Sequence, residues 1–196
     1  TGELAFVDYE TISIATNDSA AIVIDEIDSS TNDATVAIVG ANDITITGNT
    51  IVDGDTTISG KKLAAAVITA NSTNDSVSAD VSLTASDDIA VTGKITAQND
   101  ITITATNDIT IVNSDATTGA MTVTGDDFEA TGLVDAQNDI SITVTNDVDL
   151  DAVTSSNGSV SIKGATIDNQ SAIISAPTGE VTLTATNDAA TSDIDF

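Results

Sequence analysis

Residues 87–108 of this chain recur as residues 126–147, and this repeat decides the fold. The best-preserved part reads AQNDITITATND at 97–108 and AQNDISITVTND at 136–147, a spacing of 39 residues. Inside each copy, apolar residues alternate with Thr or Ser, a period of two that is typical of strands with one buried face. A repeat at a fixed spacing indicates a chain that stacks one small unit on the next.

The corners between the expected strands are Asn-Asp or Asp-Asp pairs, which bracket segments such as 101–106. Asn and Asp suit tight corners because their short polar side chains tolerate the left-handed backbone conformation. Half of the repeat spacing gives the length of one coil. We therefore predict an all-β fold, a single parallel β-solenoid (β-helix) of about ten coils of roughly 19–20 residues. At about 4.8 Å per coil, the rod would be roughly 50 Å long.

The whole chain, 1–196, is predicted to form one solenoid domain. A cap or interface is expected at about 1–15 and another at about 188–196, because the end coils of a solenoid expose strand edges and core. Three of the four aromatic residues lie in these end regions: Phe6, Tyr9 and Phe196. We expect them to form either simple caps or the contact through which one subunit stacks on the next.

The composition favours a narrow aliphatic core. Apolar residues make up 40% of the chain and aromatic residues only 2%, and the apolar set is mostly Ile, Val and Ala. Cysteine is absent, so no disulfide or thiolate metal site can form. The chain begins without a basic segment or a long apolar run. These features predict a chain that is either mature or cytosolic, with no signal peptide and no membrane span.

The charge is strongly negative. There are 31 Asp and Glu residues, four lysines and no Arg or His, which gives a net charge of −27. Nucleic acids and anionic membrane surfaces would repel such a chain, so neither is expected as a partner. Most of the acids lie beside Asn, Gly, Ser or Thr, as turn residues do.

Stacked corner acids raise the question of a bound cation. Two exposed carboxylates about 4.8 Å apart repel by somewhat under 1 kcal/mol in water and by several at an effective dielectric constant near 20. Either the acids splay into solvent, or cations lie between them. Calcium, which takes oxygen ligands, is the candidate cofactor. The candidate ligands are the acids of the repeated Asn-Asp corners: Asp100, Asp108, Asp139 and Asp147.

The sequence of the repeat resembles that of a known family. Residues 80–93 read DVSLTASDDIAVTG, and similar units cover roughly 74–148 and 180–189. These units resemble the repeats of filamentous haemagglutinin-type proteins, which are bacterial two-partner-secretion passengers. The resemblance implies a right-handed parallel β-helix at the cell surface or outside the cell, with an adhesive or structural role. This chain departs from that pattern by placing Asn-Asp where such repeats usually carry Gly-Gly or Gly-Asp.

Catalytic chemistry is not expected. Parallel β-helices include enzymes that cleave acidic polysaccharides, and these need a cationic base or paired carboxylates. The acid pairs Asp87-Asp88 and Asp126-Asp127 fall at corresponding turns of the repeat, as structural corners do and a unique active site does not. With a net charge of −27, the chain would also repel a polyanionic substrate.

Threonine rows offer a third reading. Segments such as Thr102-Ile103-Thr104 and Thr143-Val144-Thr145 place two hydroxyls on one outer strand face, as an ice-binding or surface-binding protein would require. Threonine is, however, a favoured residue on any exposed strand. The repeat is less regular over 48–72 and 149–180, which we expect to break a flat array.

The leading hypothesis is an extracellular or cell-surface structural protein, a solenoid subunit that self-associates end to end into a filament or adhesive fibre. The alternative is a monomeric adhesin segment that binds a glycan or a host surface. Ice binding through the Thr rows is the less favoured reading.

Overall fold

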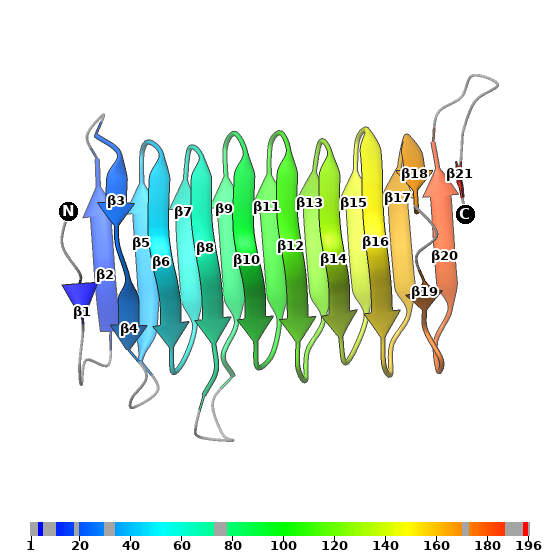
Figure 1. The fold of residues 1–196 in the computed structure, drawn as a ribbon, viewed down its shortest axis with the longest axis horizontal. Helices are drawn as coiled ribbons and strands as arrows, with labels where there is room; N and C mark the ends of the chain where they lie inside the picture. The colour runs from blue at the N-terminus through cyan, green and yellow to red at the C-terminus, as the bar shows by residue number, and fades with distance from the viewer. Residues whose placement is uncertain are drawn as a thin grey trace.

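A computed structural model describes residues 4–5, 11–17, 20–29, 34–72, 78–169, 173–186 and 194–195. All strand pairs in this part are parallel, and the chain winds as a β-solenoid between two facing sheets (Figure 1). The predicted fold class is therefore confirmed. The described residues contain no helix that is long and apolar enough to cross a membrane.

One sheet has nine strands in the described part of the chain, and their order along the rod follows the sequence. They are β2 (Thr11–Thr16), β5 (Thr35–Gly40), β7 (Thr56–Gly60), β9 (Val81–Ala85), β11 (Ile101–Ala105), β13 (Met121–Gly125), β15 (Ile140–Val144), β17 (Val160–Gly164) and β20 (Val181–Ala185).

The facing sheet has twelve strands in the same described ranges. They are β1 (Leu4–Ala5), β3 (Ile22–Ile24), β4 (Ile27–Ser29), β6 (Ile44–Val52), β8 (Leu63–Ala70), β10 (Ile89–Ala97), β12 (Ile109–Ala116), β14 (Phe128–Ala136), β16 (Asp147–Ser155), β18 (Thr166–Asp168), β19 (Ile174–Ser175) and β21 (Ile194–Asp195).

The solenoid has about eight turns rather than the ten expected. In the regular region the coil length is as predicted, because Ile101 pairs with Val81 and with Met121, each 20 positions away. Other coils are longer: Ile12 pairs with Val36, and Thr56 pairs with Val81. Such coils take up more of the sequence per turn, so the chain makes fewer turns than a uniform 20-residue coil would give.

Strand alternation builds the core as expected. Ile101 and Ile103 on β11 and Ile109 and Ile111 on β12 are each no more than 1% exposed, and Thr102 between them is exposed. The equivalent positions of neighbouring coils stack in register, so the interior is a set of aliphatic ladders. The prediction for the core is confirmed at Ile140, Ile142 and Val144 as well, whereas Leu183 is only partly buried.

The longer strands of the twelve-stranded sheet bend in the middle. The pairing register shifts between Val91 and Lys94 of β10, and the corresponding shift recurs in β6, β12 and β14. Gly93 lies at this bend, where an added Cβ would come closer than 3.0 Å to the Ala66 carbonyl oxygen and the Val67 side chain. The bend therefore lets both ends of each strand point apolar side chains into one core.

Candidate cation-binding edge

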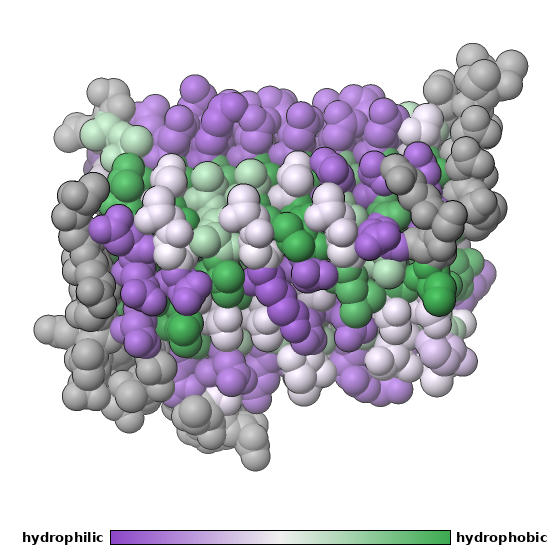
Figure 2. All heavy atoms as spheres, in the orientation of Figure 1, coloured by the Kyte–Doolittle hydropathy of each residue, from purple (hydrophilic) through white to green (hydrophobic). Residues whose placement is uncertain are grey.

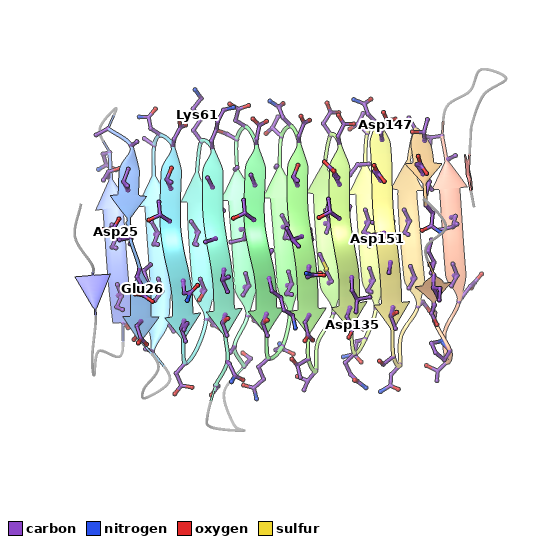
Figure 3. The ribbon with its side chains drawn as sticks, viewed as in Figure 1. Asp25, Glu26, Lys61, Asp135, Asp147 and Asp151 are labelled. Carbon is purple, nitrogen blue, oxygen red and sulfur yellow. The ribbon has the colours of Figure 1, made fainter. Side chains whose placement is uncertain are left out.

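The four predicted calcium ligands lie on two opposite edges of the rod. Asp108 and Asp147 lie on the upper edge, which we define as the corners between each strand of the nine-stranded sheet and the next strand of the twelve-stranded sheet. Asp147 is labelled at this edge in Figure 3. Asp100 and Asp139 lie on the lower edge, at the corners that lead back to the nine-stranded sheet. The structure therefore does not bring the four together.

On the lower edge, the acids serve as acceptors between coils. Asp100 Oδ1 accepts the backbone N–H of Ala120 at 2.8 Å, and Asp139 Oδ1 accepts that of Ser159 at 2.8 Å. Asp80 Oδ1 likewise accepts the backbone N–H of Asp100 at 3.0 Å. Each carboxylate thus satisfies a corner N–H of the following coil that the strands leave unpaired, which is a structural reason for an acid there.

The upper edge brings three carboxylates together. Ligand atoms of Asp108, Asp126 and Asp127 all lie within 4.8 Å of one another. Asp127 Oδ1 also accepts the backbone N–H of Asp147 at 2.9 Å. The pKa of Asp108 is raised, first by partial desolvation and then by the negative charges of Asp127, Asp88 and Asp126. Hydrophilic side chains line this edge in Figure 2.

A second row of acids continues from the upper edge onto the outer face of the twelve-stranded sheet. Glu129, Asp149 and Asp168 pair in register on β14, β16 and β18, so the three occupy the same outward position of successive coils. The pKa of Asp149 is raised by desolvation first, then by the charges of Asp168, Glu129 and Asp151. Glu129, Asp149 and Asp151 also line a shallow hollow in this face.

Two lysines pair with acids, Lys62 on the upper edge and Lys94 elsewhere on the twelve-stranded sheet. Lys62 Nζ lies 2.6 Å from Asp88 and 3.5 Å from Asp87, and its ammonium group lowers the pKa of Asp88. Lys94 Nζ lies 2.7 Å from Asp115. Within the described ranges, no such ion pair reaches Asp108, Asp126 or Asp127. The negative potential of the upper edge is therefore concentrated around Asp108, Asp126 and Asp127.

The three clustered carboxylates of the upper edge suit one kind of chemistry, the binding of a cation. Three carboxylates of adjacent coils can supply several of the six to eight oxygen ligands that calcium takes. Sequence reasoning selected Asp108 for this role but treated Asp126 and Asp127 as corners. It missed Glu129, Asp149 and Asp168. Their common position becomes visible only when each coil is aligned with the next.

The predicted subunit-interface residues Phe6, Tyr9 and Phe196 lie outside the described residues. The two stacked parallel sheets define the chain as a β-solenoid repeat protein. No protein-family model, curated protein or solved structure matches it.

Proposed function

We propose that this chain is a structural protein whose solenoid stacks end to end with further copies into a fibre. One observation carries the proposal: on the last described strand of the nine-stranded sheet, the inward side chains are exposed or only half-buried. Val181 on β20 is 41% exposed, whereas Val160, its register partner on β17, is fully buried. Leu183 is likewise only partly buried, next to the fully buried Ile162.

The first described strand of the sheet offers an unpaired edge, although its inner face is less open than that of β20: on β2, Ile12 is buried and Ile14 is half-buried. β2 and β20 are the outermost strands of the nine-stranded sheet among the described residues, and all of its pairs are parallel. Continuing the ladder from one copy to the next would place Ile12 beside Val181 and Ile14 beside Leu183. Such a contact adds strand hydrogen bonds and buries aliphatic surface, as strand addition at a sheet edge does.

The setting proposed for this fibre is the cell surface or the extracellular medium. The support is the resemblance of residues 80–93 to filamentous haemagglutinin-type repeats, which implies a right-handed helix and an adhesive or structural role. The repeated corners provide no unique catalytic constellation, so we propose a non-enzymatic role.

Electron microscopy of the purified chain tests the fibre. We expect long fibres about one solenoid wide, and we expect Val181→Asp to abolish them because it places a charge on the surface to be buried. Thr182→Asp is the matched control, since it adds the same charge on the outward face of the same strand. Uniform monomers of the unmodified chain at high concentration, with and without calcium, would contradict the proposal and favour a monomeric adhesin segment.

We also propose that calcium binds the upper edge at Asp108, Asp126 and Asp127. Thermal unfolding is then expected to occur at a higher temperature in calcium than in chelator. Ligand linkage predicts about 2.7 kcal/mol of added stability at roughly 100 times the dissociation constant. Sodium chloride of matched ionic strength is the control for screening.

Two variants locate the calcium effect. Asp126→Asn should remove most of the calcium-dependent rise, whereas Glu180→Gln, which removes one charge from the lower edge, should retain it. If the melting temperature follows ionic strength alone, the corner acids are only solvated.

A further inference from the structure

The outer face of the nine-stranded sheet carries a regular array of hydroxyl groups. From β7 to β15 both outward positions of every strand are Thr or Ser, in two columns that pair in register. One column is Thr57, Ser82, Thr102, Thr122 and Ser141, and the other is Ser59, Thr84, Thr104, Thr124 and Thr143. All ten side chains are exposed or half-buried.

The array continues beyond these five strands. Ser161 on β17 and both Thr182 and Thr184 on β20 occupy the same outward columns, and Lys163 is the one charged residue among them. The less regular segments 48–72 and 149–180 therefore do not break the register of the face, contrary to the expectation from sequence, although Lys163 in the second segment interrupts one column of hydroxyls. The strands that these segments contribute to the nine-stranded sheet, β7 and β17, pair with β5 and β15 without a register shift.

This face is set apart by its lack of acids. On a chain of net charge −27, the two columns from β7 to β20 hold no carboxylate, because the acids lie at the corners and on the facing sheet. The described pairs of the nine-stranded sheet also show no register shift, unlike those of the twelve-stranded sheet. From β7 to β15 the hydroxyls thus lie on a regular, uncharged surface, and Lys163 on β17 is the one charge in the continuation of the columns.

The spacing of the hydroxyls is set by the sheet itself. Neighbouring strands place them about 4.8 Å apart along the rod, and the two columns are roughly 6.6 Å apart, two residues along a strand. None of the ten makes a side-chain hydrogen bond within the described part of the chain. Each threonine therefore presents a free hydroxyl beside a methyl group, in a fixed two-dimensional pattern.

We propose that this face binds an ordered lattice of water, the surface of ice. Ice is uncharged, flat and periodic, and its surface oxygens repeat at distances close to those of the two columns. The hydroxyls can join the lattice while the methyl groups restrict the water between them. A crystalline polysaccharide fits less well, because sugar rings are usually bound by aromatic side chains and these columns contain none.

Slow growth of an ice crystal in a solution of the fluorescently labelled chain tests the proposal. We expect the chain to enter the ice, and we expect Thr122→Lys to be excluded because its long charged side chain stands in the middle of the array. Thr110→Lys is the matched control: Thr110 is equally an exposed strand threonine, but on the twelve-stranded sheet. It should enter the ice as the unmodified chain does.

Three results would overturn the proposal. The first is exclusion of the unmodified chain from ice. The second is an equal loss of entry into ice in both variants, with their folds intact by circular dichroism. The third is occupation of the face by another partner. The last would appear as binding to microcrystalline polysaccharide, or as a face-to-face dimer, that Thr122→Lys abolishes. The fibre has its own readout in electron micrographs, so either proposal can fail without the other.

Discussion

Replacing Ile103 by alanine is expected to lower the free energy of unfolding by about 2–5 kcal/mol. Ile103 is fully buried on β11 and lies in register between Leu83 and Val123, both also fully buried. Alanine would lose the transfer free energy of the removed methyl and methylene groups and leave a cavity. The solenoid cannot readily close this cavity, because β11 is held on both sides by its pairing with β9 and β13.

Thr102→Ala on the same strand is the control for Ile103→Ala. Thr102 is exposed, so its truncation is expected to cost well under 1 kcal/mol. Chemical denaturation followed by circular dichroism measures both values. Comparable losses in the free energy of unfolding at the two positions would show that the assignment of inward and outward side chains on β11 is wrong.

Gly119→Ala is expected to destabilise the chain by about 1–3 kcal/mol through overpacking. Gly119 lies on the lower edge over the preceding corner, where an added Cβ would come closer than 3.0 Å to the carbonyl group of Asn99 and to Asp100 Oδ1. The backbone atoms of that corner cannot move away freely, because the Asn99 N–H is bonded to the Ala79 carbonyl oxygen and Asp100 holds the Ala120 N–H.

Gly40→Ala is the comparison for Gly119→Ala. The nearest atoms to a Cβ at Gly40 are the side-chain atoms Ile22 Cδ1 and Ile44 Cγ1, at 3.1 and 3.3 Å, and these can shift by a few tenths of an ångström. Gly40→Ala should therefore lower the free energy of unfolding by less than Gly119→Ala in the same denaturation experiment. An equal or larger loss at Gly40 would mean that the lower corner is more adaptable than its hydrogen bonds indicate.

The candidate cation site was predictable only in part. Asp108 could be chosen from sequence because it belongs to a repeated corner pair. The cluster around it could not, because Asp126 and Asp127 lie one coil later and approach Asp108 only through stacking. Asp100 and Asp139 have the same sequence signature as Asp108, but the structure gives them backbone partners. Local sequence does not distinguish these two environments.

The sequence alone determined the fold class, the coil length of the regular region and the buried face of each regular strand. These properties follow from alternation and turn residues, which are local signals repeated many times. The number of turns and the neighbours across coils were decided by tertiary structure. Glu129 and Asp149, and likewise Thr102 and Thr122, are 20 residues apart and become adjacent only through the register of stacked strands. The acidic rows and the hydroxyl array are therefore properties of the stack, because no single coil contains them.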